Sequence, residues 1–233
     1  MLGPQSKLIK RTILYLILFG IAFGYVEAAV VVYLRTIGAP IRALAGLPAN
    51  TLFPLTAISQ LGDFRPLVNI ELIREAATLI MLGAVAGVAQ RRDGSGRMYG
   101  WLPAFALAFG IWDLTFYASL QALIGWPGSL FTWDLLFLLP VPWTGPVLAP
   151  VIVAASLTIG GILALLRAPA RAGWIPWTLL CAGGAILLVS FMWHWRAIVS
   201  GGVPSQFPWG IFASGEAVGV LGLMYALRTH AEA

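Results

Sequence analysis

The sequence predicts an all-α integral membrane protein, a bundle of about six transmembrane helices. Three observations carry this prediction. Hydrophobic residues make up 60% of the chain, charged residues only 10%, and the mean hydropathy is +0.89, whereas a soluble domain carries about 25% charged residues. The apolar runs are about 20 residues long, enough to cross a hydrocarbon layer of about 30 Å. They also lack the period-two alternation of a barrel, so helices are expected to satisfy the backbone in lipid.

Six apolar runs define the expected spans within a single polytopic domain that covers residues 1–233. The spans are predicted at residues 12–34, 67–89, 101–124, 146–166, 174–198 and 208–227. Pro, Gly or Arg residues mark the ends of each run. The first run is longer than the apolar core of a signal peptide, roughly 7–15 residues, so it is expected to remain as a span.

The basic residues predict how the bundle is oriented. Lys7, Lys10, Arg11, Arg91, Arg92, Arg97, Arg167, Arg171 and Arg228 fall on one side of the expected bundle, and Arg35, Arg42, Arg65 and Arg196 fall on the other. The positive-inside rule makes the first side cytoplasmic. An inner-membrane protein with both termini in the cytoplasm is therefore expected.

The same distribution bears on partners. The net charge is +5, but the basic residues stand singly or in pairs at the ends of apolar runs and form no stripe with interleaved aromatics, so nucleic acid is not an expected partner. Membrane lipids are expected partners. Other membrane subunits remain an open alternative.

The connection after the third span contains an apolar run that is too short to cross a membrane. It covers residues 130–139 and is followed by Pro140, Pro142 and Pro146. A run of this length predicts an interfacial or re-entrant half-helix on the outer side.

Small residues at helical spacing predict where helices pack closely. The sequence contains Gly20, Gly24 and Ala28, the pair Gly83 and Gly87, and the pair Gly215 and Gly219. Residues four apart lie on one face of a helix, and small side chains there let two helix backbones approach.

Charged residues inside the spans are the strongest functional signal. They are Glu27, Glu71, Arg74, Glu75, Asp113 and Glu216. A charge at the centre of a bilayer costs roughly 2.5–3.5 kcal/mol on insertion scales, so such residues face the bundle interior, pair, or bind a partner. Counting inward from the outer ends at about 1.5 Å per residue places the five acids in the outer half of the membrane.

Two of the spans carry a polar stripe. Glu71, Arg74, Glu75 and Thr78 follow i, i+3, i+4, i+7 spacing, and Asp113 and Tyr117 are four residues apart. Such residues share one helix face, and Arg74 is expected to pair with Glu71. The predicted ligand-binding set is therefore Glu27, Glu71, Arg74, Glu75, Asp113, Tyr117 and Glu216.

A cavity lined by these acids with one arginine carries excess negative charge, so its natural ligand is a cation. The predicted metal ligands are Glu27, Glu75, Asp113 and Glu216. His194, at the outer end of the fifth span, is either a further ligand or a hydrogen-bonded anchor at the membrane interface. Oxygen donors with at most one imidazole favour a hard or borderline divalent ion. A proton or a small cationic solute satisfies the same charge.

Three functions fit these residues. The first is binding or transport of a cation. The second is an accessory or structural subunit of a larger complex, in which the charges pair internally. The third is a membrane-embedded enzyme that acts on a lipid or isoprenoid with Glu75 and Asp113 as its acid and base. The chain has no Asp-rich pyrophosphate motif, no Ser/His/Asp set and no Gly-rich phosphate loop, which weakens the enzyme hypothesis.

Overall fold

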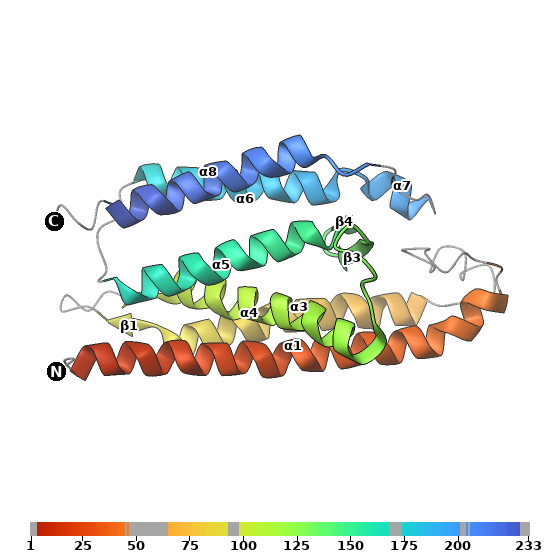
Figure 1. The fold of residues 1–233 in the computed structure, drawn as a ribbon, viewed down its shortest axis with the longest axis horizontal. Helices are drawn as coiled ribbons and strands as arrows, with labels where there is room; N and C mark the ends of the chain where they lie inside the picture. Colours follow the sequence, from red (N-terminus) through yellow and green to blue (C-terminus); the bar gives the residue numbers. More distant parts are fainter. Residues whose placement is uncertain are drawn as a thin grey trace.

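The computed structural model describes residues 4–44, 46, 65–92, 98–167, 174–200, 204 and 206–228. Within these residues, six long helices run side by side and alternate in direction (Figure 1). They are α1 (Pro4–Leu44), α3 (Arg65–Ala89), α4 (Trp101–Ile124), α5 (Leu148–Leu166), α6 (Trp174–Met192) and α8 (Trp209–Arg228). A short helix, α7 (Trp195–Val199), follows α6, and a small pair of strands, β1 (Arg91–Arg92) and β2 (Met98–Tyr99), joins α3 to α4.

Five described segments are long and apolar enough to cross a membrane. They are Ser6–Pro40, Trp101–Ile124, Leu148–Leu166, Trp174–Val199 and Trp209–Arg228. Large apolar side chains on these helices are exposed, for example Leu14, Ile159 and Leu221. An apolar exterior on helices of this length indicates a membrane-embedded protein, because lipid rather than water then surrounds the bundle.

The start of α1 and the end of α8 lie at the same end of the bundle, here called the termini end (Figure 1). The basic residues Lys7, Lys10 and Arg11 lie in the first turns of α1, and Arg228 ends α8. Arg167 follows α5 at this end and donates a hydrogen bond to the carbonyl of Leu227. The sequence analysis assigns these five basic residues to one side of the bundle, and in the structure they lie at one end of it.

The opposite end of the bundle holds a β-hairpin where a half-helix was predicted. Strands β3 (Trp133–Phe137) and β4 (Trp143–Pro146) pair antiparallel, with Asp134 opposite Gly145. The prediction of a half-helix over residues 130–139 is therefore wrong. This end is called the hairpin end below.

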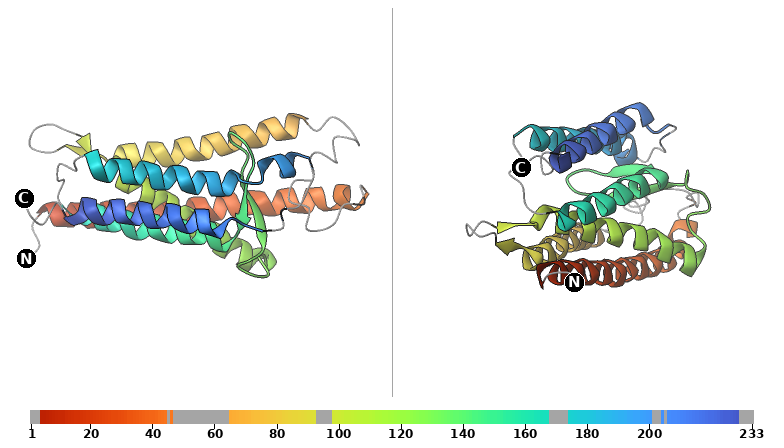
Figure 2. Two further views of the ribbon diagram at one scale, coloured as in Figure 1. Left: turned by 90° about the horizontal axis from the view of Figure 1, so that it is seen from above. Right: turned by 60° about the vertical axis from the view of Figure 1, so that its left-hand side comes forward.

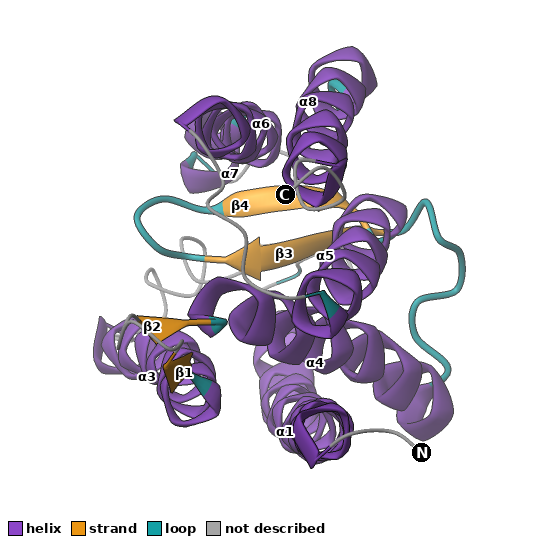
Figure 3. Ribbon diagram, turned by 90° about the vertical axis from the view of Figure 1, so that its left-hand side faces the viewer, coloured by secondary structure: helices purple, strands orange, loops and turns teal. Residues whose placement is uncertain are grey.

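The burial of the hairpin explains this error. Figure 3 shows the hairpin lying between the α6–α8 pair and the other long helices. A strand covered on both faces has a continuous apolar sequence, which periodicity cannot distinguish from a short buried helix. Trp133, Phe137 and Trp143 are aromatic, and aromatic residues fit strands well. Pro140 and Pro142 lie between the two strands, where no ladder donor is needed.

The helices form two groups that meet at α5. One group contains α1, α3 and α4, with α5 packed on α4, and the other is the pair α6 and α8 (Figure 2). The α6–α8 pair contacts the rest of the bundle mainly where α8 meets α5 and where α6 meets β4. The hairpin is thus one of the main connections between the groups.

Glycines set the closest helix contacts. A Cβ atom on Gly24 of α1 would lie 2.5 Å from the carbonyl oxygen of Trp112 in α4, and a Cβ on Gly183 of α6 would lie 2.5 Å from the amide nitrogen of Gly219 in α8. Both distances are too short for any side chain. The predicted close packing is therefore confirmed at Gly20, Gly24 and Gly215, whereas a Cβ on Gly219 itself would have no described atom within 4 Å. The atoms nearest a Cβ on Gly83 or Gly87 lie 3.7 Å and 4.0 Å away, so no backbone approaches there.

Candidate functional site

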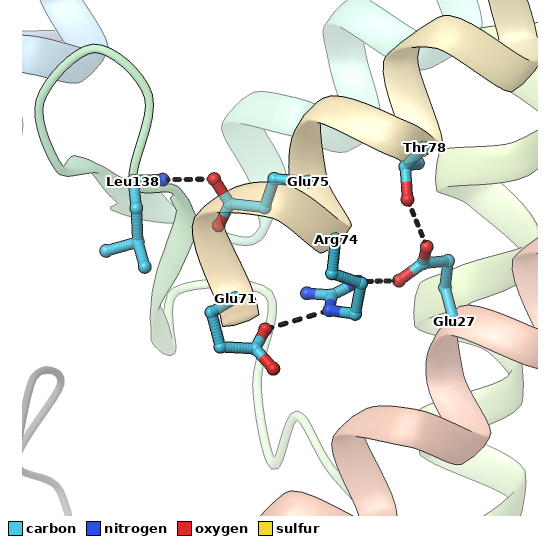
Figure 4. Close-up of polar contacts among 6 residues, drawn as sticks. All are labelled: Glu27, Glu71, Arg74, Glu75, Thr78 and Leu138. Carbon is cyan, nitrogen blue, oxygen red and sulfur yellow. Dashed lines mark hydrogen bonds and ion pairs between the residues drawn. The ribbon is translucent and has the colours of Figure 1, made fainter. Parts of the chain in front are cut away.

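The first polar site joins α1 to α3 through one arginine. Arg74 donates from Nε to Glu71 Oε2 at 2.8 Å and from Nη1 to Glu27 Oε2, and the hydroxyl of Thr78 donates to Glu27 Oε1 (Figure 4). We call Glu27, Glu71, Arg74 and Thr78 the arginine cluster. Glu27 is only 5% exposed. Its carboxylate is satisfied by two side chains of the neighbouring helix.

The helical spacing explains this geometry. Thr78 lies one turn after Arg74, so both side chains reach the same carboxylate on α1. The pairing of Arg74 with Glu71 is the one that the i, i+3 spacing predicts. Arg74 is more than a point charge here, because its planar guanidinium donates in two directions at once.

Glu75 belongs to the same helix face but contacts the hairpin. The backbone N–H of Leu138, in the turn between β3 and β4, donates to Glu75 Oε2 at 2.8 Å. Figure 4 shows Glu75 pointing toward this turn, away from Glu27. Glu75 is 7% exposed, so this hydrogen bond fastens the tip of the hairpin to α3.

The second polar site surrounds Asp134 of β3. The hydroxyl of Tyr117 donates to Asp134 Oδ2 at 3.0 Å, and Arg35 Nη2 lies 3.9 Å from Asp134 Oδ1. The guanidinium of Arg35 also lies over the ring of Trp126, 3.9 Å from its centroid. We call Arg35, Asp113, Tyr117 and Asp134 the aspartate cluster. It joins α1, α4 and the hairpin.

Asp113 is the least satisfied member of this cluster. Its side chain is buried, with the residue 9% exposed, and no residue in the described part of the chain donates a hydrogen bond to its carboxyl. The charge of Asp134 acts on both Asp113 and Tyr117. A second buried carboxyl therefore lies within range of the charge of Asp134, and Arg35 is the described counter-charge of Asp134.

The electrostatic state of Asp134 follows from its surroundings. Burial raises the pKa of Asp134 to about 6, although the charge of Arg35 and the hydrogen bond from Tyr117 act in the opposite direction. Desolvation disfavours the ionised carboxylate, while a cation and a donor favour it. Burial is the larger effect, so this carboxyl holds its proton at a higher pH than an exposed aspartate.

Glu216 and His194 lie apart from both clusters. The hydroxyl of Ser156 in α5 donates to Glu216 Oε1 of α8. His194 Nε2 lies 2.7 Å from the carbonyl oxygen of Gln206, and the imidazole packs edge-on against Trp133. The acids that we expected to converge therefore divide among separate contacts. Among the described residues, no three Asp, Glu, His or Cys side chains lie close enough to hold a metal ion.

The charges do not balance among the described side chains. Glu27, Glu71, Glu75, Asp113 and Asp134 contribute five carboxyls, and the cations that face them are Arg35 and Arg74. Excess charge in a low-dielectric interior is removed by protonation or by binding a cation. The aspartate cluster alone has two carboxyls and one arginine.

Four participants were not predicted as site residues. They are Thr78, which was predicted only as part of the polar stripe, Asp134, Arg35 and the backbone N–H of Leu138. Asp134 is the acid in the otherwise apolar run over residues 130–139, and a charge in such a run is a usable signal. The role of the Leu138 amide has no sequence signal, because it depends on the path of the turn.

Comparison with known proteins adds no further assignment. The chain matches no protein-family model, no curated protein and no solved structure. The function is therefore inferred from the geometry and charge of the two clusters.

Proposed function

We propose that this chain is a multi-pass inner-membrane protein with six spanning helices and cytoplasmic termini, and that it binds a cation at the aspartate cluster. The sixth span is α3, whose polar face lies against α1 and the hairpin. The cation proposed is a proton shared between Asp113 and Asp134. Uptake and release of a proton at a buried carboxyl is the elementary step of proton-linked transport.

The carboxyl of Asp113 is the observation that carries this proposal. It is buried, it receives no hydrogen bond from the described residues, and it interacts electrostatically with Asp134. Two carboxyls that interact in a desolvated site do not both ionise readily, so they retain a proton between them. Arg35 can compensate one negative charge, and the proton compensates the second.

A proton fits this site better than a metal ion. A divalent ion with oxygen ligands normally takes six or more donors, several of them from carboxylates. The described residues place two carboxyls and one phenol in the aspartate cluster. Arg74 and Thr78 already occupy the carboxylate of Glu27, and Glu216 contacts Ser156.

Infrared difference spectroscopy on protein in lipid nanodiscs tests the proposal. Wild-type protein is titrated from about pH 4 to about pH 9, and the C=O stretch of protonated carboxyl groups is followed. A band that disappears during the titration and is missing in Asp113→Asn is expected. Glu216→Gln is the matched control, because it removes an intramembrane carboxyl outside the clusters and should leave that band in place.

Two results would replace the proposal. If the same carboxyl bands are present in wild type and in Asp113→Asn, this residue does not hold the proton. If elemental analysis of purified wild type finds a stoichiometric metal that is lost in Asp113→Asn, the cation is that metal.

A structural role in a larger complex is the second candidate, and the arginine cluster favours it. Glu27, Glu71 and Arg74 satisfy one another without a ligand, as an internal network that fixes helix register would. In that case neutral variants of both aspartates would leave every titration unchanged, and the intact protein would purify with other membrane subunits. The acid and base of the enzyme hypothesis, Glu75 and Asp113, have different surroundings: Glu75 accepts a hydrogen bond from the Leu138 amide, and the charge of Asp134 acts on Asp113.

A further inference from the structure

The two acids of the aspartate cluster interact without touching. Among the described residues, no hydrogen bond joins Asp113 to Asp134 or to Tyr117, and the hydroxyl of Tyr117 donates to Asp134. The charges of Asp113 and Asp134 nevertheless act on one another. A proton moves between two groups that are within hydrogen-bond reach or are joined by a water molecule. A shared proton therefore needs a further group beside Asp113.

Unpartnered polar atoms gather at the junction of α4, the hairpin and α5. In the described part of the chain, the buried side-chain nitrogen and oxygen atoms without a hydrogen-bond partner are Trp112 Nε1, Trp143 Nε1, Thr144 Oγ1 and Thr158 Oγ1. One belongs to α4, two belong to β4 and one belongs to α5. A buried polar atom without a partner is costly, and ordered water is a usual partner for such atoms.

Ring contacts bring the unpartnered atoms of α4 and β4 into one region. The ring centroid of Phe137 in β3 lies 6.3 Å from that of Trp112 and 5.4 Å from that of Trp143. Thr144 follows Trp143 in β4 and is only 1% exposed. Both indoles and this hydroxyl therefore belong to the contact between α4 and the hairpin.

Thr158 of α5 brings its hydroxyl to the turn of α4 that precedes Asp113. A Cβ on Gly110 would collide with Thr158 Oγ1 and would lie 2.5 Å from the carbonyl oxygen of Ala154. Gly110 lies three residues before Asp113, and the side chains of a helix tilt toward its N-terminus, so the carboxyl of Asp113 extends toward this turn. Asp113 is 9% exposed, so a water molecule can contact it.

The chemistry of these groups suits water. An indole N–H only donates, an ionised carboxylate only accepts, and a threonine hydroxyl does both. Water donates and accepts, so it satisfies all three kinds of group. A buried water needs about two to four polar partners, and the two hydroxyls, the two indoles and the carboxyl provide them.

We propose that ordered water molecules at this junction bind the carboxyl of Asp113 and link it to Tyr117 and Asp134, with the hydroxyls of Thr144 and Thr158 as their main protein partners. This link rests on the proposed function, because the water carries the shared proton. Asp113 gives its proton to a water molecule, which passes one of its own to the Tyr117 oxygen while the phenolic proton moves to Asp134. The water and Tyr117 end unchanged.

Water-edited solid-state NMR on the full-length protein in lipid bilayers tests for the water. The method follows the transfer of magnetisation from water to nearby side chains and needs no titration. The side chains of Thr144 and Thr158 should receive it sooner than that of Ser190, a buried hydroxyl residue that donates to the Leu187 carbonyl. Equal build-up for all three would overturn the water site.

Infrared difference spectra test whether this water contacts Asp113. Acid-minus-neutral spectra are recorded in ordinary water and in water labelled with heavy oxygen. A water O–H stretch that shifts with the label is expected in wild type and should be lost in Asp113→Asn and in Thr144→Val/Thr158→Val, which removes both hydroxyls at nearly constant volume. The matched control, Thr178→Val, changes an exposed threonine that donates to the Trp174 carbonyl and should keep the band.

The outcomes separate the water link from the proton site. If the carboxyl band of Asp113 titrates without a label-sensitive water band, the link is overturned and the proton site stands. A water band that persists in Thr144→Val/Thr158→Val overturns the assignment of the two hydroxyls. If water reaches both threonines while no carboxyl titrates, the proton site fails, and the role of the water as a proton carrier fails with it.

Discussion

Buried charges make the contact between α1 and α3, whereas the backbones of α6 and α8 meet at glycines, as those of α1 and α4 also do. Glu27 and Arg74 connect α1 to α3, and Gly183 lies against Gly215 and Gly219 across α6 and α8. The first contact requires two particular side chains. The second requires that side chains be absent.

This difference indicates which helix contacts can change when the pH changes or an ion binds. A charged contact changes when a proton or an ion binds, since its strength depends on ionisation. A glycine contact depends on shape and dispersion forces, which are insensitive to pH. The chain thus combines a charged contact between α1 and α3, which can respond to protons or ions, with a glycine contact between α6 and α8, which does not.

Removal of Arg74 should have the largest effect on stability. Arg74→Leu leaves Glu27 and Glu71 without their cation, and breaking a buried pair in this way costs about 3–5 kcal/mol. Unfolding of detergent-purified variants by heat or denaturant measures the change. Arg74→Lys keeps the charge but not the two-directional donation, so it should recover part of the loss. Equal stability of Arg74→Leu and wild type would show that the pairing of Arg74 with Glu27 and Glu71 does not contribute to stability.

A side chain at Gly183 should have the next largest effect. A Cβ there would lie 2.5 Å from Gly219 N and 2.8 Å from Gly215 O, so Gly183→Val should separate α6 from α8 and cost about 1–3 kcal/mol or more. Gly184→Val is the matched control, because nothing lies within 4 Å of a Cβ at that position. The comparison is read from the thermal unfolding midpoints in one detergent. Similar midpoints for the two variants would contradict the packing described here.

The aspartate cluster should show a pH dependence of defined sign. Burial raises the pKa of Asp134 to about 6, so the folded state binds this proton more tightly than an unfolded chain does. Its contribution to stability is therefore fully present below about pH 4 and is lost as the pH rises through about 6. The stability of wild type relative to Asp134→Asn, measured by unfolding across this range, should decline as the pH rises.

Tyr117→Phe sharpens that experiment. The variant removes the hydrogen bond that favours the ionised form of Asp134, so the pKa of Asp134 should rise further and the decline should move to higher pH. A shift toward lower pH would mean that the hydroxyl favours the protonated form instead.

Neutralisation of Glu216 should have the smallest effect. Its described partner is the hydroxyl of Ser156, which can also hydrogen bond to an amide oxygen, so Glu216→Gln should change stability by less than about 1 kcal/mol. Glu27→Gln weakens the pairing with Arg74 and should cost more. The two variants, compared by unfolding under identical conditions, extend the contrast between the helix groups to a single acid in each. If Glu216→Gln loses more stability than Glu27→Gln, the contrast between the two helix groups is contradicted.

The sequence predicts the long helices well because their cause is local. A run of about 20 apolar residues must satisfy its own backbone in lipid, whatever it packs against. The depth of the acids in the membrane stays a prediction, which follows from the fixed helical rise and from the Pro, Gly and Arg residues at the ends of the runs. Both depend on distances along one helix.

The pairing of the acids could not be predicted in the same way. Glu27 meets Arg74 and Thr78, while Glu75 faces away toward Leu138. These choices depend on how each helix is rotated about its axis and on which neighbour it meets. The hairpin, which supplies Asp134 and the Leu138 amide, could not be predicted, because its continuous apolar sequence is equally typical of a short buried helix.

The length of α1 has a consequence for the surrounding lipid. The helical segment Ser6–Pro40 has 35 residues, which corresponds to about 50 Å of helix, whereas the hydrocarbon of a bilayer is about 30 Å thick. The apolar run between Arg11 and Arg35 covers residues 12–34, about 35 Å of helix, and fits the hydrocarbon with an ordinary tilt. The part of α1 after Arg35, which includes exposed Ile37, therefore extends past the hydrocarbon into the headgroup layer.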